Sequence, residues 1–302
     1  MSGIVIVGAS LAGTQAAQAA RRAGYDGPMT IVGREPHYPY DRPPLSKAYL
    51  TDDEVDEDRL RLRPAADPDA LEVDWRLGRS ATGLDGPTRT VHLDDGAEVT
   101  GEVVIVATGA SPRRLSGIEP DLAGVFELRT LDDARALRTA LAGPPVRVLV
   151  CGAGFIGAEV AASARERGHE VTLVDVAAAP LDRVLDRAAG LAVADLHRGH
   201  GVDVRLATGL VGVEHAGDPA RVTAATLSDG TTVPADVVVV GIGVVPEVDW
   251  LAEAGLTVDD GLVADDHLTA GPGILVAGDV ARWPNARFGG QLMRVEQWDN
   301  AV

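Results

Sequence analysis

The chain has 302 residues, of which 46% are hydrophobic, and a formal net charge of −18. This length favours two domains with sizeable cores, and the negative charge argues against nucleic acids or anionic membranes as partners. The longest apolar stretch, residues 237–245, is too short to cross a bilayer, and the single Cys151 rules out a disulfide framework. Because no basic leader segment opens the chain, we expect a soluble, cytoplasmic protein.

A glycine-rich turn follows the first apolar run. We expect a buried strand over residues 3–7, a helix over about 11–24 and a second strand over about 29–33. Small residues at such a turn let the backbone approach a pyrophosphate, which then rests on the helix N-terminus. The candidate phosphate-binding residues are Gly8, Ser10, Leu11, Ala12 and Gly13. Glu35, after the second strand, is the candidate for the ribose hydroxyls.

Residues 38–47 are rich in proline and aromatic side chains. Prolines fix the backbone and remove donors, so we expect a stiff loop that is neither strand nor helix and that is suited to holding a cofactor ring. The segment ends in Lys47, the only lysine among 27 basic side chains. A compact ammonium beside a flavin would stabilise electron density arriving on the ring; chance is the alternative explanation of a lone lysine.

The middle of the chain shows a hairpin and a helix. Residues 91–106 predict a hairpin turned at Asp94-Asp95-Gly96 that ends in Ala107-Thr108-Gly109. Residues 112 to about 122 are typical of a crossing segment between domains. Residues 131–141 have helical periodicity, which Gly143-Pro144-Pro145 would stop.

A second glycine-rich turn, Gly152 to Gly157, follows the apolar run 146–151. Asp175, at the end of the next expected strand, would accept hydrogen bonds from an adenosine ribose and repel a 2′-phosphate. This favours NADH over NADPH, although Arg183 lies near enough to act in the opposite sense.

Glu159 follows the second turn, and we expect it on the first turn of the helix. One interpretation is a helix start stabilised by the dipole. The other is that Glu159 reaches across the domain interface and pairs with Lys47.

The two glycine turns have matching surroundings. Asp95-Gly96 and Asp229-Gly230 are each followed, at identical spacings, by a valine, an apolar strand, a glycine and a proline. Such repetition indicates two copies of one unit; two unrelated glycine loops are the alternative. Strands alternating with helices predict an α/β fold with parallel, doubly wound sheets. Two neighbouring nucleotides favour hydride transfer between a nicotinamide and a flavin.

After residue 245 we expect the chain to return to the first domain. Residues 273–278 predict a buried strand that ends at Asp279. Because ligands of open α/β sheets bind outside the carboxyl ends of strands, Asp279 is placed to hydrogen-bond a cofactor hydroxyl. Capping a helix is the alternative role of this carboxylate.

Five motifs together resemble the ferredoxin reductase-like flavoproteins, over nearly the whole chain. The motifs are residues 39–47, 107–109, 128–134, 278–281 and 295–301. The resemblance implies a glutathione-reductase-like architecture with two Rossmann-like domains. In it, a discontinuous FAD-binding domain comprises residues 1–113 and 242–302, and an NAD-binding domain comprises residues 114–241.

The resemblance also implies a set of site residues and a reaction. The residues implied for FAD and its surroundings are Gly8, Ser10, Leu11, Ala12, Gly13, Glu35, Arg42, Pro43, Lys47, Ala81, Ala107, Thr108, Gly109, Arg129, Gly278, Asp279, Glu296, Gln297 and Trp298. Those implied for NADH are Gly152, Gly154, Phe155, Ile156, Gly157, Asp175, Arg183, Gly241, Ile242 and Gly243. Lys47 and Glu159 match the family's charged pair beside the flavin. NADH would reduce FAD, which would pass single electrons to a ferredoxin-type iron–sulfur protein.

The chain departs from the family pattern at Ser10, which replaces the middle glycine of the first turn, and family members continue past the position of Val302 into a third domain. Disulfide reductases need two redox cysteines, and one cysteine excludes them. Cys151 is expected to be a core thiol. We expect no metal site, with His197 and His200 on the surface at a helix end. An NADH-sensing flavoprotein or NADH oxidase with little ferredoxin turnover is the alternative function.

Overall fold

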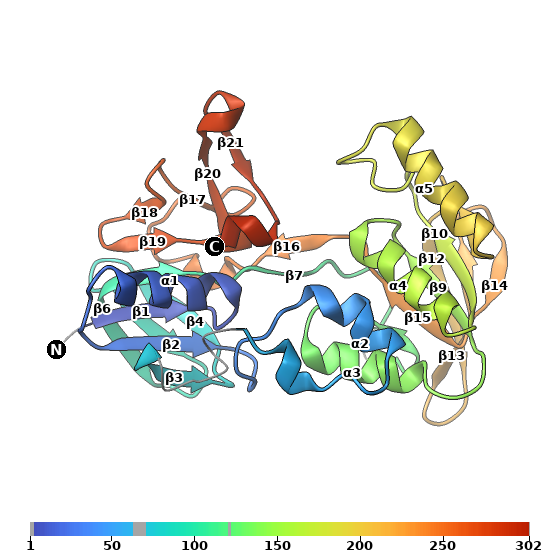
Figure 1. Ribbon diagram of the computed structural model, residues 1–302, viewed down its shortest axis with the longest axis horizontal. Helices are drawn as coiled ribbons and strands as arrows, with labels where there is room; N and C mark the ends of the chain where they lie inside the picture. Colours follow the sequence, from blue (N-terminus) through green and yellow to red (C-terminus); the bar gives the residue numbers. More distant parts are fainter. Residues whose placement is uncertain (1–2, 63–70, 120–121, 302) are drawn as a thin grey trace. The chain divides into compact units, whose positions relative to one another are not determined.

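The computed structural model describes residues 3–62, 71–119 and 122–301. The chain divides into two compact units (Figure 1). The first unit comprises residues 1–41, 57–111 and 245–302, and the second comprises residues 42–56 and 112–244. The expected boundaries after residues 113 and 241 lie within three residues of two of these. The contacts additionally assign residues 42–56, which hold Lys47, to the second unit.

The first unit is built on a largely parallel sheet. Its strand order is β18-β19-β6-β1-β2-β3. The bounds are β1 Gly3–Val7, β2 Met29–Gly33, β3 Asp74–Leu77, β6 Glu98–Val106, β18 Thr269–Gly271 and β19 Ile274–Val276. Helix α1, Leu11–Arg22, follows β1. Strands β1 and β2 read as continuous apolar runs because parallel strands are covered on both faces, and Ile6 and Ile31 are fully buried.

Two smaller β elements complete the first unit. Strands β4 Ala81–Asp85 and β5 Thr90–Leu93 form an antiparallel hairpin, and β5 pairs with β6. The expected turn at residues 94–96 is confirmed, since Gly96 has a φ of +83° between β5 and β6. Strands β17 Leu262–Val263, β20 Ala281–Asn285 and β21 Gln291–Arg294 form a further sheet.

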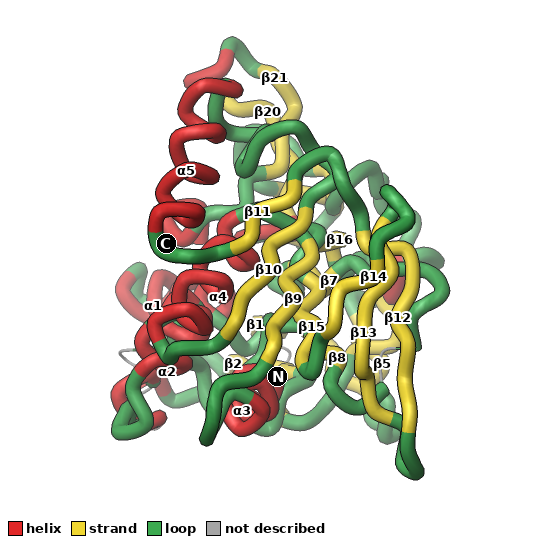
Figure 2. Tube along the Cα trace, turned by 90° about the vertical axis from the view of Figure 1, so that its right-hand side faces the viewer, coloured by secondary structure: helices red, strands yellow, loops and turns green. Residues whose placement is uncertain are grey.

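The second unit repeats the parallel arrangement. Its sheet has the order β11-β10-β9-β15-β8, and helices α4 and α5 pack against strands β9, β10 and β11 (Figure 2). The bounds are β8 Val125–Phe126, α3 Leu131–Ala140, β9 Arg147–Cys151, α4 Phe155–Glu166, β10 Glu170–Val174, α5 Arg187–Gly199, β11 Asp203–Arg205 and β15 Val237–Val240. A second, antiparallel sheet consists of β12 Leu210–Ala216, β13 Arg221–Leu227 and β14 Thr232–Pro234.

The internal repeat predicted from the spacings is confirmed by strand register. In the first unit Val7 lies opposite Val106 on one side and Val32 on the other. In the second unit Cys151 lies opposite Val240 and Val174 in the same way. Each glycine turn therefore starts at the same point of an equivalent three-strand frame.

The expectation of an irregular loop over residues 38–47 is wrong in part. Pro43–Ser46 forms a 3₁₀-helix, and Ala48–Thr51 forms the short helix α2. Both prolines stand in the first turn of the 3₁₀-helix, where a helix needs no N–H donor and where the fixed proline φ is favourable. Proline therefore starts this helix.

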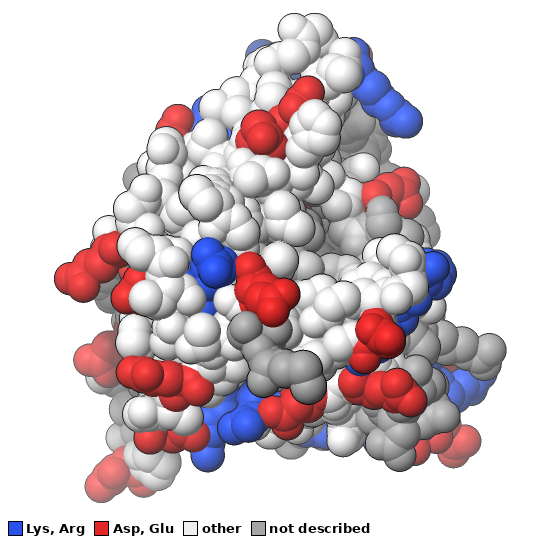
Figure 3. Space-filling model, turned by 90° about the vertical axis from the view of Figure 1, so that its left-hand side faces the viewer, with Lys and Arg blue, Asp and Glu red and all other residues white. Residues whose placement is uncertain are grey.

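Two of the passages of the chain between the units lie within short strands. These are β7 Ala110–Pro112 and β16 Val244–Pro246, which pair with each other. Among the described residues, none of the helices combines the length and apolar character needed to cross a bilayer. Acidic side chains are spread over the face of the molecule shown in Figure 3, in keeping with the net charge of −18.

Candidate functional site

The first glycine of each glycine-rich turn is required by the backbone conformation and by the packing of the turn against a neighbouring strand. Gly8 has a φ of +123°, and an added Cβ would lie 2.0 Å from the carbonyl oxygen of Ala107. Gly152 has a φ of +103°, and its added Cβ would lie 2.2 Å from the carbonyl oxygen of Gly241. Any side chain would push the turn away from the neighbouring strand's end, so glycine is needed for both conformation and packing.

The last glycine of each turn lets a helix approach its strand. A Cβ added to Gly13 would lie 1.9 Å from the Gly8 carbonyl oxygen, and one added to Gly157 would lie 1.8 Å from the Gly152 carbonyl oxygen. These backbone contacts hold α1 and α4 close behind β1 and β9. The N-terminus of each helix is therefore aimed at the carboxyl end of its sheet.

The middle position of the second turn has a different requirement. A Cβ on Gly154 would meet nothing within 4 Å, so packing within the protein does not explain this glycine. The N-termini of α1 and α4 have no side-chain cap and no acid in the first turn. Open space in front of uncapped backbone N–H groups fits a dinucleotide pyrophosphate. In the first turn this position is Ser10, the N-cap residue of α1.

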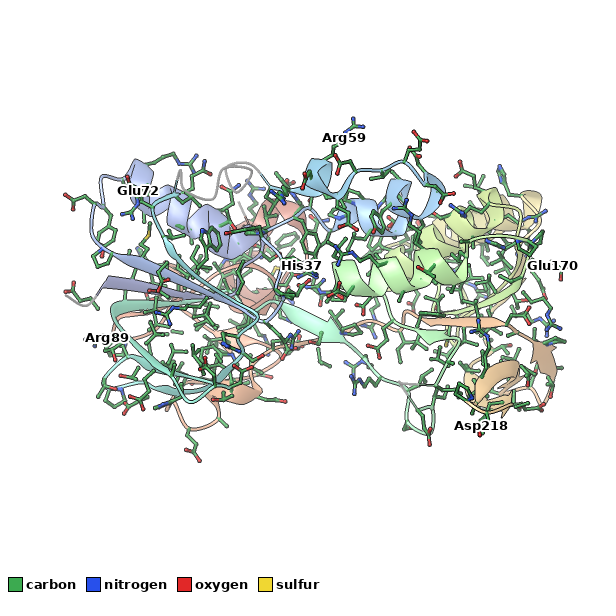
Figure 4. All side chains as sticks on the ribbon, turned by 90° about the horizontal axis from the view of Figure 1, so that it is seen from below. His37, Arg59, Glu72, Arg89, Glu170 and Asp218 are labelled. Carbon is green, nitrogen blue, oxygen red and sulfur yellow. The ribbon has the colours of Figure 1, made fainter. Side chains whose placement is uncertain are left out.

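Asp175 holds the second turn in place. Glu170 marks the amino end of β10 (Figure 4), and Asp175 follows the carboxyl end. One carboxylate oxygen accepts the Ala153 N–H at 2.5 Å, and the other accepts the Ala177 N–H at 2.8 Å. Each carboxylate oxygen has two lone pairs, so ribose hydroxyls are compatible with both contacts. The sequence predicted the acid but not its bond to the glycine turn.

The residues that follow β2 in the first unit, where Asp175 follows β10 in the second, make different contacts. Glu35 accepts a hydrogen bond of 2.5 Å from the hydroxyl of buried Tyr40, across the segment that contains His37 (Figure 4). The preceding Arg34 is paired at 2.8 Å with Glu247, which also accepts from the Ser111 hydroxyl. Arg34 is thus partly neutralised by a residue that sequence reasoning did not single out.

The loops opposite the glycine turns are also alike. Gly109 has a φ of +68° after Ala107-Thr108, and Gly243 has a φ of +102° after Gly241-Ile242. The Thr108 hydroxyl donates to the Glu247 carbonyl at 2.7 Å, which fixes the first of these loops. In each unit, therefore, the chain bends sharply after the strand that lies next to the glycine-rich turn. A glycine-rich turn that could bind a pyrophosphate is here called a phosphate-type turn.

The predicted pairing of Lys47 with Glu159 is confirmed as an ion pair of 2.7 Å. Both residues belong to the second unit, so the expectation that the pair crosses a domain interface is wrong. The expected place of Glu159 is also wrong, because α4 begins at Phe155 and Glu159 is its fifth residue. Beyond the first turn, the helix dipole has little effect on a carboxylate. The Lys47 ammonium also donates to the Pro43 carbonyl at 3.1 Å.

Arg129 directly precedes Thr130, the N-cap residue of α3, which forms a capping box with Asp133. The Thr130 hydroxyl accepts the Asp133 N–H, and the Asp133 carboxylate accepts the N–H groups of Thr130 and Arg129 at 2.8 and 3.0 Å. The Arg42 guanidinium donates to the Arg129 carbonyl oxygen. Residues 128–134 therefore form the start of α3. They also accept a hydrogen bond from Arg42, which belongs to residues 42–56, here called the Lys47 segment.

Asp279 follows β19 as the sequence predicted. It lies inside the 3₁₀-helix Gly278–Val280, whose cap position is Ala277, so the alternative role of a helix cap is wrong. Gly278 has a φ of +73°, and an added Cβ would lie 2.8 Å from the Ala12 Cβ, which shows how closely this turn approaches α1.

Arg294, which sequence reasoning missed, braces this region from β21. Its guanidinium donates to the Asp279 carbonyl at 3.3 Å and to the carboxylates of Glu296 and Asp260 at 2.5 and 3.2 Å. Trp298 is half exposed, and Glu296 and Gln297 are exposed. The only indication of these contacts in the sequence is that Arg294 stands two residues before Glu296.

The candidate residues are divided between the two units. Arg42, Pro43, Lys47 and Arg129 lie in the second unit, while the other residues predicted for FAD lie in the first. Ala81 is half-buried at the start of β4. The residues predicted for NADH all lie in the second unit; Phe155 is 59% exposed, and Arg183 is exposed in the segment before α5.

Cys151 is a buried thiol at the end of β9, as expected. Burial raises the pKa of this thiol to about 11, so it remains protonated and unreactive near neutral pH. The expectation that His197 is a surface residue is wrong, because the inner face of α5 packs against β11 and buries it. His200 is exposed.

A family model described as pyridine nucleotide-disulphide oxidoreductase matches residues 2–302. Rhodocoxin reductase of Rhodococcus erythropolis is 40% identical over 99% of this chain and 69% of its own length. Rubredoxin-NAD(+) reductase of Pseudomonas putida is 38% identical over 99% of this chain and 77% of its own length.

A solved structure, the covalent putidaredoxin reductase–putidaredoxin complex, matches with a TM-score of 0.94 and 36% identity, over 99% of this chain and 72% of that chain. Such similarity in both sequence and structure confirms the resemblance to ferredoxin reductases and the doubly wound α/β architecture. The single cysteine cannot supply the redox disulphide in the family's name. With its paired phosphate-type turns on two repeated α/β frames, the chain belongs to the pyridine nucleotide-disulphide oxidoreductase family of flavin-dependent enzymes.

Proposed function

We propose that this chain is an FAD-dependent NADH:ferredoxin oxidoreductase. The observation that carries the proposal is the duplicated phosphate-type turn, with open space at Gly154 that no packing explains. The chain is similar to rhodocoxin reductase, to putidaredoxin reductase and to the ferredoxin–NAD(+) reductase component of a p-cumate dioxygenase system, and these names support a reductase that acts on a ferredoxin. A cytoplasmic location remains a prediction from the sequence.

The residues of the two turns would hold two nucleotides in different ways. Gly8 to Gly13 would receive the pyrophosphate of FAD, with Glu35 and Asp279 at its hydroxyl groups. Gly152 to Gly157 would receive that of NADH, with Asp175 at the adenosine ribose. The negative charge of Asp175 would oppose a 2′-phosphate, which supports NADH over NADPH.

When bound, FAD supplies a ring that accepts a hydride from NADH and gives up electrons one at a time. The residues of this chain would position the two nucleotides and balance the negative charge that develops on the flavin. The Lys47 ammonium, held by Glu159 and by the Pro43 carbonyl, would stabilise negative charge that develops on the flavin. No side chain is needed as a nucleophile.

An anaerobic titration of the purified protein with NADH tests the proposal. We expect a bound-flavin absorption band that NADH bleaches, with NADPH far less effective. A colourless protein to which FAD does not bind, or a bound flavin that NADH cannot bleach, would contradict it.

The acceptor is tested separately by steady-state turnover. Rapid NADH-dependent reduction of a [2Fe–2S] ferredoxin would support the reductase. A long-lived complex of reduced flavin with NAD⁺, or electron transfer to oxygen alone, would support the NADH-sensing or oxidase alternative instead.

A further inference from the structure

Two buried serines form a chain of hydrogen bonds behind the Lys47–Glu159 pair. The Ser46 hydroxyl donates to Glu159 Oε2 at 2.5 Å, the same oxygen that Lys47 Nζ approaches at 2.7 Å. The Ser163 hydroxyl, one turn further along α4, donates to the Ser46 carbonyl at 2.7 Å. Each serine is 5% exposed, whereas the side chains of Glu159 and Lys47 are 30% and 50% exposed.

The choice of partners by the two hydroxyl groups is informative. A serine inside a helix commonly donates back to the carbonyl four residues earlier, which for Ser163 would be that of Glu159. Ser163 instead bonds to the end of the 3₁₀-helix Pro43–Ser46. The Ser46 hydroxyl likewise bonds to a side chain on α4 and not to its own turn. Both bonds join the Lys47 segment to the helix that carries Glu159.

A half-exposed ion pair is a poor device for fixing geometry. Two long side chains lose entropy when they are held together, and water screens their attraction. A hydrogen bond from a buried hydroxyl to the carboxylate is both more rigid and less screened. The fixed point of this cluster is therefore the serine chain, and the ammonium is placed through the carboxylate that the serine chain holds.

We propose that Ser46 and Ser163 are positioning residues that set the orientation of Glu159 and, through it, the place of the Lys47 ammonium. The proposal rests on the proposed function only in that Lys47 then acts on the flavin. Their effect on hydride transfer is transmitted through Glu159.

The single lysine of the chain allows a test without turnover. In the 302-residue chain labelled with ¹³C-lysine, the side-chain Cε/Hε signal belongs to Lys47 alone. We expect Ser46→Ala to shift this signal toward its position in Glu159→Gln, and Ser163→Ala to shift it in the same direction. Ser163→Ala keeps a good helix former in α4, so this second variant still tests the proposal if Ser46→Ala fails to fold.

Thr139→Ala is the matched control, because its hydroxyl bonds to the Arg135 carbonyl within α3 and does not contact the pair. Its lysine signal should stay at the wild-type position. A wild-type signal in both Ser46→Ala and Ser163→Ala would overturn the proposal, whether or not NADH reduces the flavin.

Rapid-reaction kinetics give the functional test. We expect Ser46→Ala to slow flavin reduction by NADH about tenfold with unchanged FAD content, and to have little further effect in a Glu159→Gln background. Equal slowing in both backgrounds would show that Ser46 acts independently of Glu159 and would overturn the proposal. If NADH fails to reduce the wild-type flavin, the proposed function fails, and the lysine signal still decides the role of the serines.

Discussion

At the scale of single residues, Asp175 combines two tasks. Its carboxylate accepts the N–H groups of Ala153 and Ala177, and it stands where the sequence predicted a ribose ligand. The sequence indicated this residue because an acid after the second strand of a nucleotide fold is a local signal. The bond to Ala153 could not be predicted, because it depends on how the glycine turn folds back toward β10.

We therefore expect Asp175→Ala to lower the preference for NADH over NADPH by on the order of tenfold or more, since it removes a charged acceptor and its repulsion of a 2′-phosphate. The ratio of kcat/KM for the two coenzymes measures this. Asp203→Ala, which removes an exposed acid paired with Arg205 on β11, should leave the ratio unchanged. An unchanged ratio in Asp175→Ala would show that another group reads the ribose.

Lys47 is the second residue whose role is open to direct test. We expect Lys47→Ala to slow flavin reduction by NADH on the order of a hundredfold, because a positive charge beside the flavin is lost. Lys47→Arg should restore little, since a planar guanidinium cannot replace a compact ammonium between Glu159 and the Pro43 carbonyl. Stopped-flow absorbance measures the rate, and a wild-type rate in Lys47→Ala with FAD bound would rule out this role.

At the scale of elements, His169 links α4, β9 and α3. Its Nδ1 accepts the Val146 N–H at 3.2 Å, and its Nε2 lies 3.0 Å from the Leu141 carbonyl. A carbonyl only accepts, so the ring is neutral with its proton on Nε2. A second proton on Nδ1 would face the Val146 N–H. Burial lowers the pKa of His169 from its ordinary value of 6.5.

This geometry predicts a pH dependence of stability. Because the folded pKa lies below the unfolded value of 6.5, the unfolded state takes up a proton first. The stability that the neutral ring contributes is therefore complete above 6.5 and is lost as the pH falls below it. Urea unfolding at about pH 7.5 and about pH 5.5 should show a smaller pH-induced loss in His169→Gln than in the wild type.

A second buried histidine extends that experiment. Burial also lowers the pKa of His197, so His197→Gln should reduce the loss in the same sense. Identical pH dependence in the wild type and in His169→Gln would contradict the assignment.

Elements with a strong apolar period were predicted closely, including β1, β2 and α3. The 3₁₀-helix Pro43–Ser46 was not, because proline was interpreted as excluding a helix when it favours the first turn of one. The burial of His197 was also missed, since the side of α5 that faces β11 is decided by packing and not by local sequence.

At the scale of the whole molecule, the two phosphate-type turns lie in separate units. We expect FAD to protect residues 8–13 from hydrogen exchange and NAD⁺ to add protection at residues 152–157, because each nucleotide should order the N–H groups that it contacts. Mass-spectrometric hydrogen exchange measures both segments. Protection of one segment by both nucleotides would contradict the assignment of one nucleotide to each unit.

The sequence by itself determined the repeated α/β frame, the two glycine turns and the acid at position 175. These are local patterns, since strand period, turn chemistry and short spacings are written in consecutive residues. Only the tertiary structure decided that Lys47 and Glu159 lie in the same unit, that Ser46 and Ser163 lie behind them, and that Glu247 neutralises Arg34. These contacts join residues between 112 and 213 positions apart, and such distant pairs are selected by packing and burial, which no single segment contains.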